Sequence, residues 1–172
     1  MRRRAFLTVT TVSLAALAGC FGSDDDADDD GVPDEEDDYP EDPERSRRID
    51  TIADTVTVGD GKFFPQEVTL EEDGGVTVDF TVEEGPEIDI IVLPEDQYER
   101  FRSGQTWRAK PGTVVGRSGG GTEQVSLPPG TYFVRVDNSS QGVAYASPTR
   151  KDNPATVSFE TETWASPPSD EE

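Results

Sequence analysis

Apolar and polar residues alternate with period two through most of the chain after Ile49, a pattern typical of half-buried β-strands. Each alternating segment would place its apolar side chains on one face of a sheet. Clusters of glycine, proline and aspartate separate the segments and predict turns. The alternating apolar positions are Val56, Val58; Val68, Leu70; Val76, Val78, Phe80, Val82; Ile88, Ile90, Val92; Val125, Leu127; Tyr132, Val134, Val136; and Val157, Phe159.

One segment, 94–103, predicts a short helix. Pro94 suits its first turn, and Gly104 would end it. Tyr98 and Phe101 are three residues apart and would face the sheet. Seven or eight short strands with one helix predict an all-β fold, an antiparallel β-sandwich, with a closed barrel as the alternative.

The first twenty residues have a different pattern, with a basic start and an apolar run that is too short for a comfortable membrane span. Residues 2–7 (Arg-Arg-Arg-Ala-Phe-Leu) resemble a twin-arginine export signal, and residues 17–20 (Leu-Ala-Gly-Cys) resemble the lipobox of secreted lipoproteins. The resemblance implies that Cys20, the single cysteine, takes a lipid and becomes the mature N-terminus. The alternatives are an ordinary secretory signal with an incidental Cys20, and export by the Sec route.

Composition changes mark the domain boundaries. An acidic, proline-containing segment follows the cysteine, and self-repulsion is expected to extend it into a disordered tether. The end of the chain has the composition of a frayed tail. The expected organisation is a signal peptide at 1–19, a lipidated acidic tether at 20–48, a β-sandwich domain at 49–164 and a disordered tail at 165–172.

The chain is strongly acidic, with 37 acidic residues, 15 basic residues and a formal net charge of −22. Such a surface repels nucleic acid and anionic headgroups, so neither is an expected partner. Acidity spread over a folded domain, with few lysines, resembles the proteins of salt-loving archaea. The tether and signal together predict a protein on the extracellular face of the cell membrane.

Residues 125–138 read Val-Ser-Leu-Pro-Pro-Gly-Thr-Tyr-Phe-Val-Arg-Val-Asp-Asn, a turn that enters a late strand. With the apolar strand 87–93 and the segment 98–104, this order resembles the GOLD-type and pre-peptidase C-terminal-type β-sandwich modules of secreted microbial proteins. That resemblance implies a non-catalytic binding or accessory module. Gly130 would supply the turn and Tyr132 a large ring facing the core.

A second resemblance is to the opening strands of cupredoxins, carried by residues 63–70 and 75–80. Copper in those proteins needs histidine and a cysteine thiolate. The chain has no histidine, and its one cysteine is assigned to the lipid. The sequence therefore excludes a copper carrier and leaves open a metal-free sandwich of that shape.

The residue inventory argues against an enzyme. Without histidine there is no Ser-His-Asp centre, no histidine base and no ordinary zinc site. The three lysines (Lys62, Lys110, Lys151) fall in turn or loop sequences, where a solvated lysine is expected. Carboxylates are so numerous that two acids near one another carry little information on glycoside hydrolysis.

One acidic segment has the spacing of a calcium loop. Residues 26–37 fit D-x-D-x-D-G-x-x-D-x-x-D, which resembles an EF-hand-like loop or a thrombospondin type 3 repeat. Calcium takes 6–8 oxygen ligands, and a glycine at the sixth place permits the sharp turn. The last place lacks the usual glutamate, and an acidic spacer that matches by chance is the alternative. The expected side-chain ligands are Asp26, Asp28, Asp30, Asp34 and Asp37.

Two further features suggest surface roles. Asn138-Ser139-Ser140 is an N-glycosylation sequon at the end of a predicted strand, so Asn138 is a candidate glycan site. Trp107 and Trp164 would stack on sugars if both were exposed on one groove, and otherwise are packing residues.

These features together predict a lipid-anchored cell-surface protein whose sandwich is a non-catalytic binding module for an envelope protein or a carbohydrate. The alternative is a structural envelope protein with a metal-free cupredoxin-like sandwich and no specific ligand.

Overall fold

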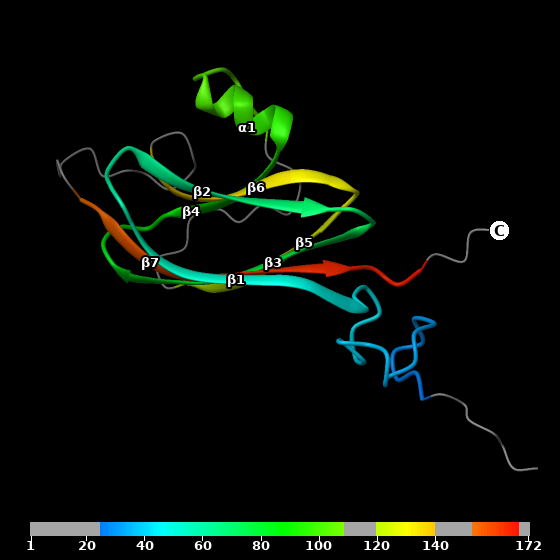
Figure 1. Cartoon of the computed structure of the whole chain (residues 1–172). Helices are drawn as coiled ribbons and strands as arrows, with labels where there is room; N and C mark the ends of the chain where they lie inside the picture. Colours follow the sequence, from blue (N-terminus) through cyan, green and yellow to red (C-terminus); the bar gives the residue numbers. More distant parts are fainter. Residues whose placement is uncertain (1–24, 109–119, 140–152, 169–172) are drawn as a thin grey trace, which may run out of the picture.

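Seven strands form two antiparallel sheets that pack face to face, with one short helix outside them (Figure 1). The computed structural model describes residues 25–108, 120–139 and 153–168. This architecture confirms the predicted all-β sandwich. In chain order the elements are β1 (Arg47–Val58), β2 (Lys62–Leu70), β3 (Gly74–Glu84), β4 (Asp89–Pro94), α1 (Glu95–Arg102), β5 (Gly121–Leu127), β6 (Gly130–Asn138) and β7 (Ala155–Ala165).

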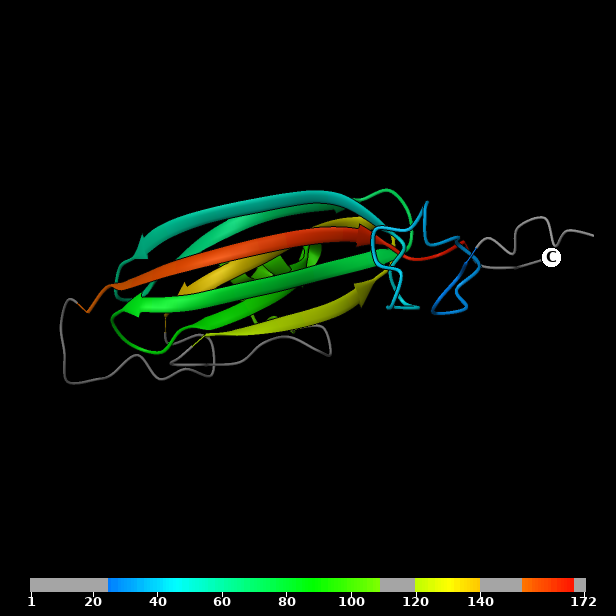
Figure 2. The same ribbon diagram turned by 90° about the horizontal axis from the view of Figure 1, so that it is seen from below.

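The strands divide unequally between the two sheets. Sheet A has the order β1-β7-β3-β5, and sheet B has the order β2-β6-β4. Figure 2 shows the four strands of sheet A side by side. The chain changes sheets in the hairpin between β1 and β2, where Gly61 has a φ of +70°. The edge strands β1 and β2 therefore lie on the same side of the sandwich.

The predicted apolar positions fill the space between the sheets. Val76, Val78 and Phe80 of β3 face Val134 and Val136 of β6 across a single buried cluster. Alternation along each strand produces this arrangement, because successive side chains point to opposite faces of a sheet. The cluster also contains Val58, Val68, Leu70, Ile88, Ile90, Val92, Leu127, Tyr132, Ala155, Val157 and Phe159.

Close packing at one end of sheet A requires a glycine. Gly75 of β3 lies beneath Trp164 of β7, and a Cβ atom on Gly75 would stand 2.3 Å from both the Trp164 ring and the Val125 carbonyl oxygen. Trp164 is fully buried, and its Nε1 donates a hydrogen bond to Thr77 Oγ1 at 3.2 Å. Trp164 is thus a packing residue of sheet A.

The helix α1 covers the outer face of sheet B, as Figure 1 shows. Its buried residues, Tyr98 and Phe101, are those the sequence predicts. The Tyr98 ring stacks on Phe133 with centroids 3.9 Å apart, and the Phe101 ring meets Phe63 edge-on at 5.0 Å. β4 and the second half of β6 are consequently buried on both faces, whereas the outer face of β2 is exposed at Pro65, Glu67 and Thr69.

A charged pair lies in this second buried layer. Arg135 and Asp137 of β6 are both 0 % exposed, and Arg135 Nη2 lies 3.1 Å from Asp137 Oδ1. The Arg135 guanidinium stacks 3.2 Å from the Phe101 ring centroid. Burial lowers the pKa of Arg135 and raises the pKa of Asp137, while each charge opposes the shift of the other. Asp89 of β4, also buried, is the cross-strand neighbour of Asp137.

Removal of the Arg135 charge is expected to be severely destabilising. Arg135→Met leaves the Asp137 carboxylate buried without its cation, which costs about 3–5 kcal/mol of unfolding free energy. The double variant Arg135→Met/Asp137→Asn should recover a substantial part of that loss. Chemical denaturation at fixed salt measures both values. A single variant as stable as the parent chain would contradict a structural role for the pair.

Candidate functional site

The acidic segment that precedes β1 is folded in its described part, residues 25–46, where the sequence predicts a disordered tether. Turn hydrogen bonds recur along it, among them Asp34 N to Asp25 O at 2.7 Å and Asp42 N to Tyr39 O at 2.8 Å. The segment then joins the end of sheet A through Ser46 N, which donates to Ala165 O at 3.0 Å. We call residues 25–46 the stem. The expectation of disorder fails here because the stem finds partners on the sandwich.

Tyr39 fixes the stem to the sandwich. Its ring is buried beneath the guanidinium of Arg45, 4.1 Å from the ring centroid, and lies 5.4 Å from that of Arg48. Glu162 of β7 pairs with both arginines, at 3.5 Å and 2.6 Å. Burial, reinforced by the Glu162 carboxylate, raises the pKa of Tyr39 to about 12. This clamp places the acidic loop at the end of sheet A where β1 begins (Figure 1).

The predicted calcium loop adopts a tight turn around its first three aspartates. Carboxylate oxygens of Asp26, Asp28 and Asp30 lie within 4.8 Å of one another. Asp26 accepts hydrogen bonds from Asp30 N at 3.2 Å and Gly31 N at 3.0 Å. The turn needs left-handed backbone at Asp29 (φ 60°) and Gly31 (φ 90°), conformations that aspartate tolerates and glycine adopts freely.

Several carboxylate oxygens of the loop are shielded from solvent without a hydrogen-bond donor. Among the described residues, Asp28 Oδ2, Asp30 Oδ2 and Asp37 Oδ2 are buried and have no partner. Buried acceptors normally find donors or cations. Burial raises the pKa of the Asp28 carboxyl, and the nearby Asp30 and Asp26 carboxylates raise it further. A hard divalent cation held by Asp26, Asp28 and Asp30 would satisfy the first two of these oxygens, and carboxylates are the ligands that calcium prefers.

The two remaining predicted ligands are placed differently. Asp34 Oδ1 accepts a hydrogen bond from Ala27 N at 2.8 Å, which closes the loop on itself. Asp37 Oδ1 accepts from Tyr39 N at 2.6 Å, so this residue connects the loop with the clamp. The structure thus brings Asp26, Asp28 and Asp30 into one group, and Asp34 and Asp37 lie outside that group.

The structure argues against a glycan on Asn138. The residue is 3 % exposed, and its Nδ2, the atom that would carry the sugar, donates to Val58 O and Asn153 O at 3.0 Å each. The amide instead ties the end of β6 to the β1–β2 hairpin. Local sequence carries the sequon but not this burial, and Ser140 lies outside the described residues.

The two tryptophans do not share a groove. Trp164 is buried in sheet A, whereas Trp107 packs against Phe101 on the helix side of sheet B, with ring centroids 5.7 Å apart. Tyr98 is buried under α1. Packing is therefore the role that the structure gives to these rings.

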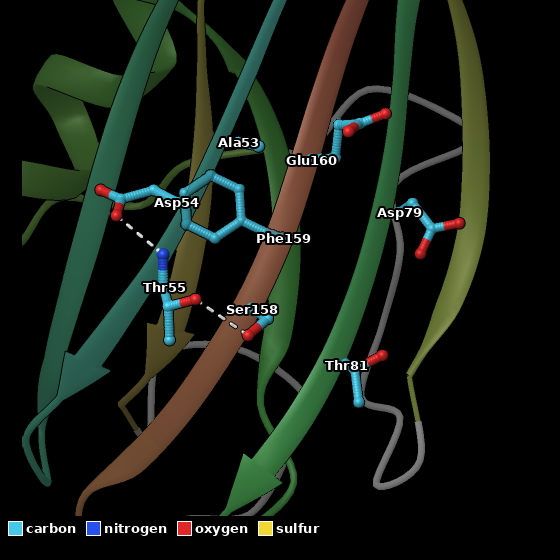
Figure 3. Close-up of a pocket in the computed structure, with 8 residues that line it drawn as sticks. All are labelled: Ala53, Asp54, Thr55, Asp79, Thr81, Ser158, Phe159 and Glu160. Atoms are coloured by element: carbon cyan, nitrogen blue, oxygen red, sulfur yellow. Dashed lines mark hydrogen bonds between the residues drawn. The ribbon is translucent and has the colours of Figure 1, made fainter.

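A shallow hollow of about 410 Å³ lies on the outer face of sheet A. Figure 3 shows its lining side chains on β1, β7 and β3, including Thr55 and Ser158, whose hydroxyls are 2.9 Å apart. Asp79 and Glu160 are cross-strand neighbours there. All lining residues are neutral or acidic: Ala53, Asp54, Thr55, Asp79, Thr81, Ser158, Phe159 and Glu160.

Cys20, Lys110 and Lys151 lie outside the described residues, so the lipid site and the lysine assignments stay predictions. Within the described part of the chain, no helix is both long and apolar enough to cross a membrane.

Comparison with known proteins adds no relative. No family model matches the chain, and a search of curated proteins finds no match. The resemblances to secreted β-sandwich modules and to archaeal lipoproteins therefore stay predictions.

The raised pKa of Asp28 predicts the pH dependence of the metal-free loop. A folded loop that binds the Asp28 proton more tightly than the unfolded chain loses stability as pH rises from the ordinary aspartate value of 3.8 through the raised pKa. Exchange protection of the Asp34 amide, corrected for intrinsic rates, should therefore fall as pH rises above the ordinary aspartate value. Asp28→Asn should flatten this fall, and an identical slope in both proteins would contradict the prediction.

Proposed function

We propose that the chain is an exported, lipid-anchored surface protein in which a calcium-binding stem holds a non-catalytic β-sandwich in a fixed position on its anchor. The observation that supports the stem's role is the group of shielded, unpartnered carboxylate oxygens in a loop that is itself clamped to the sandwich. Without a cation, like charges so close together repel one another. Calcium would convert this repulsion into attraction and close the loop.

Asp37 lies outside the aspartate group but at the end of the same loop, so its contacts would carry an ordering of the loop to the sandwich. Its Oδ1 accepts from Tyr39 N, and Tyr39 is the residue held between the two arginines. The next residue, Asp38, exchanges main-chain and side-chain contacts with the same region: Asp38 N donates to Ser46 O, and Arg48 N donates to Asp38 Oδ2. Ordering of the loop by calcium would therefore reduce the motion of the sandwich relative to the stem.

The composition of the sandwich favours a binding role over a catalytic one. The hollow on the outer face of sheet A has an acidic and hydroxyl lining on an open sheet face, where water screens the carboxylates. The buried ionisable pair of β6 is enclosed by aromatic rings of the helix layer. A binding module accounts for a domain of this kind, because binding requires surface shape and charge without an activated nucleophile or base.

Calcium binding is tested by titration of the purified chain after treatment with a chelator. We expect a dissociation constant of about 10⁻⁴ to 10⁻³ M, the range of extracellular calcium modules. Asp30→Asn should weaken binding about tenfold or more because it removes a charged ligand. Asp29→Asn is the matched control: it removes the same charge from an exposed neighbour and preserves the left-handed backbone that asparagine tolerates.

The calcium-dependent ordering of the stem has its own readout. Saturating calcium should slow amide exchange at Tyr39 and Arg48 in the parent chain and in the Asp29→Asn variant, but not in Asp30→Asn. Calcium binding without added protection at these amides would contradict the proposed coupling. Equal affinities for both variants would argue for nonspecific binding to an acidic segment.

The anchor is tested in cells with Cys20→Ser. Loss of the thiol removes the site of lipid attachment, so the protein should be released into the medium or remain as an unprocessed precursor. Fractionation and mass measurement of the N-terminus distinguish these forms. A processed Cys20→Ser protein that still needs detergent for its release from membranes would overturn the anchor.

A further inference from the structure

A narrow slot opens between the two edge strands β1 and β2, on the side of the sandwich opposite β4 and β5. It has a volume of about 170 Å³. Ile49 and Ile52 on its rim are each 38 % exposed, and they are the exposed large hydrophobic residues of the described chain. The full lining is Ile49, Asp50, Ile52, Gln66, Glu67, Val68, Thr69, Thr161 and Thr163.

The slot coincides with a change in the core-facing positions of two strands. Val68 and Leu70 of β2 point into the sandwich, and Gln66 continues the same alternation with a buried polar side chain. On β7, Val157 and Phe159 are followed on the same face by Thr161. Positions that are apolar elsewhere in the core are therefore polar where the sheets open.

Gln66 is the key residue of the slot, because it has a buried hydrogen-bond donor with nothing to receive it. The residue is 8 % exposed, and its Oε1 accepts from Thr161 Oγ1 at 3.1 Å. Its Nε2 is buried and has no partner among the described residues. Reversal of the amide would only exchange which end lacks a partner. An unsatisfied amide of this kind costs free energy that a ligand acceptor would recover.

The remaining polar groups limit the chemistry of that ligand. The Thr161 hydroxyl is already used by Gln66, and Thr163 Oγ1 donates to Asp50 O at 3.3 Å. One unpartnered donor beside aliphatic side chains fits a ligand with a carbonyl next to an aliphatic group, which is the repeating chemistry of a peptide. A pure hydrocarbon lacks the acceptor, and a polyol would find its donors and acceptors largely unmatched.

The charges on the rim of the slot favour a basic ligand over an acidic one. Asp50 and Glu67 lie on it, and both are exposed. These carboxylates disfavour an acidic partner, including the outer face of a second copy of this chain. The β1 edge also resists simple strand addition, since the amides of Thr51 and Thr55 donate to the carboxylates of Asp50 and Asp54 at 2.8 Å and 2.7 Å (Figure 3 shows the second pair).

We infer that the β1–β2 slot binds an extended peptide segment of a partner protein, with an aliphatic side chain inserted beside Ile52 and Val68. A backbone carbonyl of the segment accepts from Gln66 Nε2, and basic residues flank the inserted side chain, next to Asp50 and Glu67. This inference extends the binding role proposed for the sandwich and names the class of its partner. It depends on neither the lipid nor calcium.

The test uses the full chain carrying Cys20→Ser and two blocked peptides, Lys-Val-Ile-Val-Lys and Glu-Val-Ile-Val-Glu, titrated in separate NMR experiments. The lysine peptide should shift the Gln66 side-chain amide and the Ile52 methyl resonances in a saturable way. Its affinity should exceed that of the glutamate peptide by about tenfold or more at low salt. No saturable shift with either peptide overturns the inference, and equal affinities overturn the basic partner class.

Variants locate the binding in the slot. Ile52→Lys is a surface change that blocks the slot and repels lysine, and it should weaken binding by about tenfold or more. Thr57→Lys adds the same charge at an exposed position farther along β1, outside the slot lining, and should leave the affinity within about twofold. Equal effects of both substitutions would mean general charge attraction and overturn the site.

Gln66→Met keeps the side-chain length but removes the hydrogen-bond donor. It should weaken peptide binding with little loss of the Ile52 methyl shift at saturation.

The calcium titration separates this inference from the proposed calcium-binding role of the stem. Peptide binding without a calcium response supports the slot and rejects the stem, and a calcium response without peptide binding does the reverse.

Discussion

Burial of β4 and of the second half of β6 on both faces is the constraint on which the rest of the structure depends. One face contributes to the core between the sheets, and the other lies under α1 with its layer of aromatic rings. A three-stranded sheet in this position must satisfy every polar group it encloses. Arg135 of β6 meets only part of that requirement, through its ion pair with Asp137 and its stacking on Phe101, because its three guanidinium nitrogens have no hydrogen-bond partner among the described residues.

Sheet A, by contrast, has a solvated outer face. Sheet B carries the helix, and sheet A contacts the stem. The open end of sheet A receives the stem through Tyr39 and the arginines around Glu162. Most cations near the stem are thus committed to carboxylates, which leaves the aspartates of the loop without neutralising partners from the protein. The proposed calcium ion would supply that missing counter-charge at the place where the stem meets the sandwich.

Sequence periodicity predicted the strands well because alternation directly reports which side chains face the core. Val134 and Val136 were identified in this way, but Arg135 and Asp137, which alternate with them along β6, have the pattern of solvent-facing residues. Only the docking of α1 makes that face interior, and no local pattern contains this information. The same limit applies to Asn138, whose sequon is local but whose hydrogen bonds to Val58 and Asn153 are not. The spacing of Asp26, Asp28 and Asp30 did identify a cluster, since a loop of that length brings its own residues together.

The hydrogen bond from Ser46 N to Ala165 O, and the pairing of β1 with β7, place the start of β1 and the end of β7 at the same end of the sandwich. β1 then runs away from the stem for 12 residues, a span of about 40 Å at the usual rise of a strand. The sandwich is therefore elongated along β1, with the stem at one end and the β1–β2 connection at the other. The turn at Gly59–Gly61 lies at the end far from the stem, and the β1–β2 slot lies along the side of the sandwich. In the proposed anchored protein, the slot would face sideways, at a distance from the membrane that depends on the stem.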